Sequence, residues 1–93
     1  MMRLSEQDIT NALCLHYAQR RQVKPEDVEV QLMWDEELGF SAEIWVQGRS
    51  QYAVEANMLE AIERYLFEQH GIRIFRSQIR LELDEDISAV ISD

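Results

Sequence analysis

Residues 28–46 read VEVQLMWDEELGFSAEIWV, and this stretch decides the fold. Every second residue is apolar in each half of it: Val28, Val30, Leu32 and Trp34, then Phe40, Ala42, Ile44 and Val46. Most residues between them are polar, and an acidic segment, 35–39, separates the two halves. A period of two predicts an antiparallel hairpin with one buried face and one face in solvent. Placing Trp34 opposite Phe40 brings the apolar residues of both strands onto the same face.

The segments that flank the hairpin predict a helix and a third strand. Ser5 is a good N-cap, with Asp8 three residues later, and apolar residues then recur at helical spacing to about Gln22. After the hairpin, a tight turn at 47–49 leads into a strand near 50–54, whose register stays open. Tyr52 and Val54 face the core in one register, whereas a slip of one residue puts Tyr52 beside Trp45 on the outer face.

The second half of the chain predicts one more helix and one more hairpin. Asn57 begins a capping-box pattern, and Gly71 is well placed to end the helix. Residues 79–83 and 87–91 alternate on either side of an acidic turn at 84–86. The predicted order is therefore α-β-β-β-α-β-β. We expect an α+β fold with one mainly antiparallel sheet and two helices packed on one of its faces, in a strand order that the pattern leaves open.

Size and charge restrict the kind of protein. The 93 residues predict a single globular domain, 1–93, and no apolar run approaches the roughly 20 residues that cross a bilayer. The first residues lack a signal peptide, and Cys14 is the only cysteine, which fits a reducing cytoplasm. Eighteen acidic residues against nine basic ones give a net charge of −9. We therefore expect a cytoplasmic protein that binds neither nucleic acid nor membranes.

Few residues suggest catalysis. The three glycines are isolated, so no phosphate-binding or dinucleotide-binding loop is present, and we expect neither an enzyme nor a bound cofactor. His16 falls on the apolar stripe of the first helix. It is either a ligand or base in a small cleft, or a core histidine bonded to a backbone carbonyl. Cys14, His16 and His70 match no zinc-binding spacing, so no metal ligand is assigned.

Two acidic turns, 35–37 and 84–86, leave a second possibility open. If both lie at the same end of the sheet, their six carboxylates could bind Ca²⁺ or Mg²⁺. Neither turn has the spacing of a calcium-binding loop. The simpler interpretation is a solvated turn that keeps a sheet edge from pairing.

Apolar residues on faces that are predicted to be solvent-exposed indicate a contact surface. Met33 and Trp45 lie on the polar side of the hairpin, and Phe67 lies on the charged side of the second helix. Trp, Met and Phe are enriched where proteins meet, although scattered exposed apolar side chains are common. Nearby positive charge gathers at Arg73, Arg76 and Arg80, which could seat the acidic turns of a second copy.

Several segments resemble a known family. LSEQDI (4–9), VEVQLM (28–33), GFSAE (39–43) and ANMLEAI (56–62) are similar to the YxcD-like family of small uncharacterised proteins from Bacillus-type bacteria. The resemblance implies a soluble bacterial protein and brings no catalytic residue, cofactor or substrate. The α-β-β-β-α order also resembles double-stranded RNA-binding domains, but those carry a lysine cluster where this chain has Asn57 to Glu60.

The sequence thus favours a small acidic module that associates with itself, as a homodimer, or with a protein partner, without catalysis. The alternative is a protein that binds a small molecule or a divalent metal in a cleft near His16 or at the acidic turns.

Overall fold

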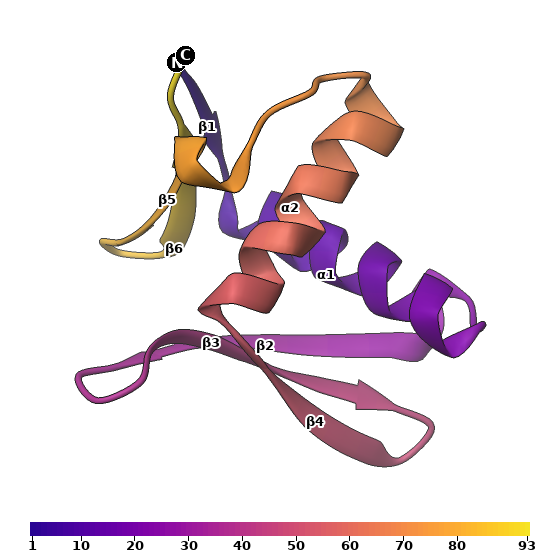
Figure 1. Cartoon of the computed structure of the whole chain (residues 1–93). Helices are drawn as coiled ribbons and strands as arrows, with labels where there is room; N and C mark the ends of the chain where they lie inside the picture. Colours follow the sequence, from indigo (N-terminus) through magenta and orange to yellow (C-terminus); the bar gives the residue numbers. More distant parts are fainter.

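Two helices and two three-stranded antiparallel sheets make up the fold, in a computed structural model that describes residues 1–93 (Figure 1). One sheet has the strand order β2-β3-β4 and the other has the order β1-β6-β5. The elements in chain order are β1 (Met2–Leu4), α1 (Glu6–Arg21), η1 (Pro25–Asp27), β2 (Val28–Asp35), β3 (Gly39–Val46), β4 (Arg49–Val54), α2 (Glu55–His70), η2 (Arg76–Gln78), β5 (Ile79–Leu83) and β6 (Ile87–Ile91).

The β2–β3 hairpin has the predicted register, with Trp34 opposite Phe40 and Val30 opposite Ile44. Its turn is held by Asp35, whose Oδ1 accepts the backbone N–H groups of Glu37 and Leu38 at 2.9 and 2.7 Å. Such a side-chain bond is the reason why aspartate is favoured in turns.

The open register of the third strand is settled by β4. Ala53 pairs with Ala42 and is fully buried, whereas Tyr52 pairs with Glu43 and is 65% exposed. Tyr52 therefore shares the outer face with Trp45, as the second of the two registers predicts. Val54 also points outward and is 57% exposed, because residues of one parity share one face of a strand.

Helix α1 confirms the predicted start. The Ser5 hydroxyl accepts the Asp8 N–H at 3.1 Å, and the Asp8 carboxylate accepts the Ser5 N–H at 3.0 Å, which completes a capping box. The helix ends at Arg21, and Gln22 takes the left-handed conformation, with φ of 58°.

The N-cap of helix α2 is Val54, three residues before the predicted cap Asn57. The helix begins at Glu55, directly after β4, so Asn57 is the third helical residue rather than the N-cap. The Asn57 side-chain oxygen accepts the Val54 N–H at 3.1 Å, the bond that a glutamate or glutamine makes in an ordinary capping box. The end of the helix is as predicted, at Gly71 with φ of 67°.

The prediction of one sheet is wrong. The last hairpin does not extend the β2–β3–β4 sheet; β6 instead pairs with β1, a strand of three residues that the sequence analysis missed. Leu4 pairs with Ala89, and Leu81 pairs with Ala89 from the other side. A three-residue strand is too short to show a period of two, so only the tertiary pairing reveals it.

Both helices cover the same face of the β2–β3–β4 sheet, with the second sheet beside them (Figure 1). Their buried residues join those of both sheets in one cluster, in which Ile9, Leu13, Ile44, Met58 and Ile62 are fully enclosed. The opposite face of β2–β3–β4 is left without a covering element (Figure 1). No helix has the length and apolar character needed to cross a bilayer.

Shortening a central core side chain should destabilise the fold. Ile62 is fully buried on α2, so we expect Ile62→Ala to lower the free energy of unfolding by about 2–5 kcal/mol. Leu38→Ala, at a turn residue that is 74% exposed, is the matched control and should change it by less than about 0.5 kcal/mol. Urea denaturation followed by circular dichroism measures both. Equal effects at the two positions would contradict this placement of the core.

Candidate functional site

The uncovered face of the β2–β3–β4 sheet carries a cleft of about 330 Å³. We call it the sheet patch, and its lining residues are Met33, Asp35, Leu38, Ser41, Tyr52 and Val54. The register explains the grouping, because Met33, Ser41 and Val54 form one row across the three strands. Ser41 is 7% exposed although it faces outward, since it forms the floor between larger neighbours.

Trp45 extends this apolar surface along β3. It pairs with Ser50, and Tyr52 is therefore its diagonal neighbour on the same face. Trp45 itself is half-buried, whereas Leu38 at the hairpin tip is 74% exposed.

The charge of this face has one sign. Its side chains from β2–β4 include the carboxylates of Glu29, Asp35 and Glu43 and no lysine or arginine, because Arg49 belongs to the opposite parity. Glu36 and Glu37 add two exposed carboxylates at the adjoining turn. The surface is therefore both apolar and acidic.

A second apolar surface lies between the C-terminal half of α2 and the segment that leads to η2. We call it the arginine–phenylalanine patch; it surrounds a cleft of about 170 Å³ and is lined by Glu63, Arg64, Phe67, Arg73, Ile74 and Phe75. Phe67 is 49% exposed and Phe75 is 64% exposed. The Arg73 guanidinium lies over the Phe67 ring, 4.6 Å from its centroid, in a cation–π contact.

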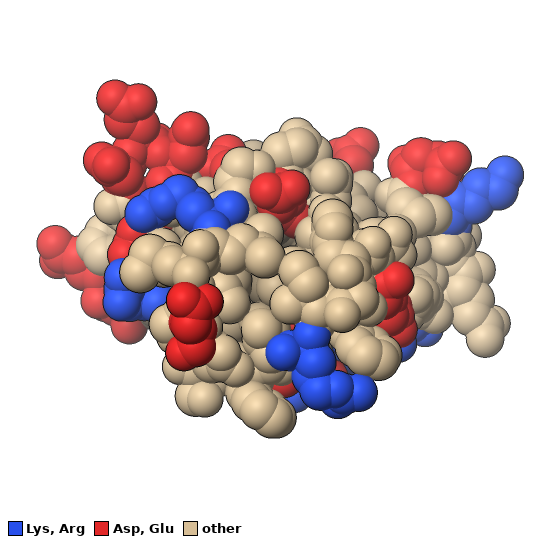
Figure 2. Space-filling model, turned by 90° about the horizontal axis from the view of Figure 1, so that it is seen from above, with Lys and Arg blue, Asp and Glu red and all other residues tan.

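Of the three arginines at this second patch, two form ion pairs and one does not. Arg76 pairs with Glu63 at 3.4 Å, and Arg64 pairs with Glu68 at 3.6 Å. Arg73 makes no ion pair, so its charge faces solvent beside the aromatic rings. Seen from the end of the molecule where the termini lie, acidic side chains border much of the outline, and basic ones form a few separate groups (Figure 2).

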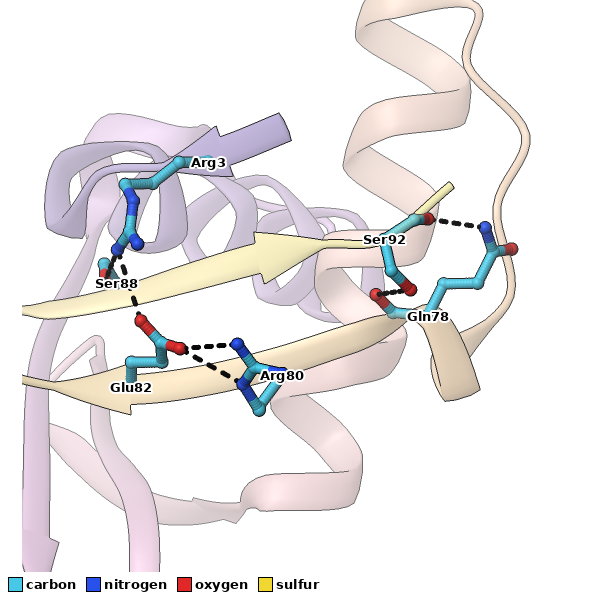
Figure 3. A network of polar contacts seen from close by, with 6 residues as sticks. All are labelled: Arg3, Gln78, Arg80, Glu82, Ser88 and Ser92. Atoms are coloured by element: carbon cyan, nitrogen blue, oxygen red, sulfur yellow. Dashed lines mark hydrogen bonds and ion pairs between the residues drawn. The ribbon is translucent and has the colours of Figure 1, made fainter. Parts of the chain in front are cut away.

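Arg80 belongs to a different network. It donates to Glu82 from Nε and Nη2, at 3.1 and 2.7 Å, and Arg3 reaches the same carboxylate at 3.4 Å and Ser88 at 3.0 Å (Figure 3). The hydrogen bond from Arg80 is the largest cause that lowers the pKa of Glu82. These contacts tie β1, β5 and β6 together, so Arg80 serves this sheet and stays apart from Arg73 and Arg76.

The six residues expected to form one interaction surface thus fall into three places. Met33 and Trp45 lie on the acidic outer sheet face, Phe67 and Arg73 line the second patch with Arg76 at its border, and Arg80 lies on β5. The sequence analysis did not predict that Leu38 and Val54 line the sheet patch, or that Phe75 lines the arginine–phenylalanine patch. Leu38 stands next to three carboxylates in the turn, and this juxtaposition was the available signal.

His16 is buried between α1 and α2, with only 3% of its surface exposed. Neither ring nitrogen has a hydrogen-bond partner, so the expected bond to a backbone carbonyl is not formed. The adjoining cavity is about 10 Å³, which is room for one water molecule. Gln19 and Arg64 are among the residues that line it, and the Arg64 guanidinium donates to the Gln19 side-chain oxygen at 2.8 Å. A cavity of this size does not accommodate a substrate.

Burial lowers the pKa of His16, because desolvation disfavours the charged imidazolium. Smaller contributions come from the charges that face it on both helices: Glu60 and Glu68 raise the pKa, whereas Arg64 and Arg20 lower it. Burial also raises the pKa of the Cys14 thiol, whose Sγ lies 3.5 Å from the Val28 carbonyl oxygen. A thiol in this state is a poor nucleophile.

The two acidic turns belong to different sheets, because 35–37 joins β2 to β3 and 84–86 joins β5 to β6. No group of three or more His, Cys, Asp or Glu side chains is close enough to hold a metal ion. The six carboxylates are therefore not brought into one cluster.

The buried histidine should make stability depend on pH. Its pKa in the folded chain lies below the value of about 6.5 for an unfolded chain, so the unfolded state binds more protons just below that pH. The contribution is present above about pH 6.5 and is lost as the pH falls toward the folded pKa, at no more than about 1.4 kcal/mol per pH unit. Urea denaturation between pH 7.5 and about 5 measures it.

His16→Leu should flatten this dependence, and His70→Gln, at the exposed end of α2, should retain it. A wild-type slope that His16→Leu leaves unchanged would refute the assignment.

Comparison with known proteins places the chain in a family. Residues 1–86 match the family described as "Protein of unknown function (DUF2653)". The "Uncharacterized protein YxcD" of Bacillus subtilis (strain 168) is 28% identical over 83 residues, which cover 88% of this chain and 81% of that protein. No solved structure matches the chain. The resemblance to YxcD-like proteins is thereby confirmed, and the chain belongs to the DUF2653 family.

Proposed function

We propose that this protein is a protein-interaction module without catalysis, and that it binds its partner through the sheet patch. The observation that carries the proposal is the uncovered face of the β2–β3–β4 sheet, where three apolar side chains around one cleft are more than half exposed. They are Leu38 at 74%, Tyr52 at 65% and Val54 at 57%.

Grouping distinguishes this surface from ordinary exposed apolar residues. Single exposed apolar side chains are normal on any protein, but a contiguous patch with a polar rim marks an interaction site. Here Met33, Tyr52 and Val54 come from β2 and β4 and meet over Ser41 of the central strand. Trp45 continues the surface, and Tyr and Trp are common anchors of protein interfaces.

The charge of the patch indicates the chemistry of the partner. Its carboxylates have no cation on the same face, so the complementary surface would bring lysine or arginine together with apolar side chains. The same charge disfavours a nucleic acid, because the phosphates would meet like charge. It also disfavours stacking this face on the same face of another copy, since both copies would bring carboxylates and no cation to the contact.

The cleft has little of what catalysis needs. Its only polar side chains are Asp35, Ser41 and Tyr52, and it contains no histidine, cysteine, lysine or arginine. Asp35 is already engaged in holding its own turn. Binding without chemistry is the function that this arrangement supports best.

Selection from a random peptide library displayed on phage tests the proposal. We expect the enriched peptides to combine basic with aromatic or aliphatic residues, and their binding to shift the NMR signals of β2–β4 amides. The double variant Leu38→Ser, Tyr52→Ser should weaken that binding by about tenfold or more, because it removes two apolar anchors.

Leu83→Ser, at an exposed leucine of the other sheet, is the matched control and should bind as the wild type does. Enrichment of acidic peptides, or binding that ignores the double variant, would count against the proposal.

A further inference from the structure

One surface of this same chain has the chemistry that the sheet patch requires. The arginine–phenylalanine patch presents Phe67 and Phe75 beside Arg73. It is apolar and locally basic in a chain whose net charge is −9. We propose that the sheet patch of one copy binds the arginine–phenylalanine patch of a second copy, in a head-to-tail contact; this inference rests on the proposed function and names its partner.

Arg73 is the residue best suited to this contact. Its guanidinium makes no ion pair with a carboxylate and lies over the Phe67 ring, 4.6 Å from the ring centroid. An arginine restrained in this way loses little side-chain freedom when it meets an acidic surface. The sheet patch offers Asp35 at its edge and Glu36 and Glu37 on the adjoining turn, all three exposed.

The apolar parts of the two patches are also complementary. Leu38 projects from the tip of the β2–β3 hairpin with 74% of its surface exposed, next to those three carboxylates. The second patch has a cleft of about 170 Å³ lined by Phe67, Ile74 and Phe75 together with Arg64, Arg73 and Glu63, and Glu63 is paired with Arg76. A leucine next to exposed carboxylates therefore complements, in charge and apolar character, an apolar cleft at which Arg73 has no ion-pair partner.

The positions of the two patches decide the type of assembly. Helix α2 leaves the sheet at Val54, and Phe67 lies twelve residues beyond Glu55, about 18 Å further along the helix axis. The β2–β3–β4 sheet and the C-terminal end of α2, which carry the two patches, lie toward opposite ends of the molecule (Figure 1). Unlike surfaces at opposite ends cannot satisfy each other within one pair of copies, so the contact is heterologous and leads to rings or open chains.

Light scattering combined with two variants tests the inference. At about 0.15 M salt, where the Debye length of about 8 Å screens the net repulsion between copies, we expect the wild-type mass to rise beyond two chains from micromolar to millimolar concentration. Arg73→Glu blocks the arginine–phenylalanine patch, and Leu38→Ser, Tyr52→Ser blocks the sheet patch. Each variant alone should need a concentration about tenfold or more above that of the wild type to associate, because it loses anchors of the contact.

Mixing the two variants gives the discriminating result. One retains an intact sheet patch and the other an intact arginine–phenylalanine patch, so the mixture should form a 1:1 complex of two chains and grow no further. Lys24→Glu, an equal charge change at an exposed residue outside both patches, should associate as the wild type does. Circular dichroism and thermal unfolding check that each variant is folded, as the exposure of the substituted residues predicts.

Several outcomes would overturn the inference. They are a wild-type chain that remains monomeric at millimolar concentration, a wild-type mass that stops at two chains, and a mixture of the two variants that stays monomeric while the wild type associates. Each leaves the proposed function to be decided separately, because the peptide selection measures partner binding on the sheet patch in a chain that need not associate with itself.

Discussion

The fold depends on the packing of two helices against one face of one sheet. Ile62 of α2, Leu13 of α1 and Ile44 of the central strand are fully enclosed members of one buried cluster, which is the core of this small chain. Both helices of the chain lie on this one face of β2–β3–β4, so neither is left to cover the opposite face. The second sheet packs beside the helices and leaves the outer face open (Figure 1). The exposed apolar side chains there follow from this shortage of covering elements.

Local patterns in the sequence were sufficient for most elements. The alternation in 28–46 predicted the hairpin and its register, and Ser5 with Asp8 predicted the start of α1. These local patterns failed where a segment was too short to show a period, or where one residue fitted two capping roles. β1 has three residues, and Asn57 could serve either as an N-cap or as the third residue that bonds back to Val54. Sheet membership depended on the long-range pairing of β6 with β1, which no local period encodes.

The candidate site was harder to predict than the fold. Met33 and Trp45 were recognisable because they interrupt an alternating pattern, whereas Val54 was ambiguous until the register of β4 was known. Phe67 and Phe75 come from α2 and from an irregular segment, and only the tertiary structure places them around one cleft. For His16, the location was predictable but the hydrogen bonding was not. Its helical position correctly predicted burial, but the missing partner at both nitrogens could not be inferred from spacing.

The direct passage from β4 into α2 has a mechanical consequence. Val54 is at once a rim residue of the sheet patch and the cap of the helix, and Asn57 fixes its backbone N–H. Because no loop separates β4 from α2, the backbone at Val54 is restrained by the helix that follows it. The surface that a ligand contacts is therefore preorganised at this edge. Most of the conformational entropy lost on binding is lost by the ligand.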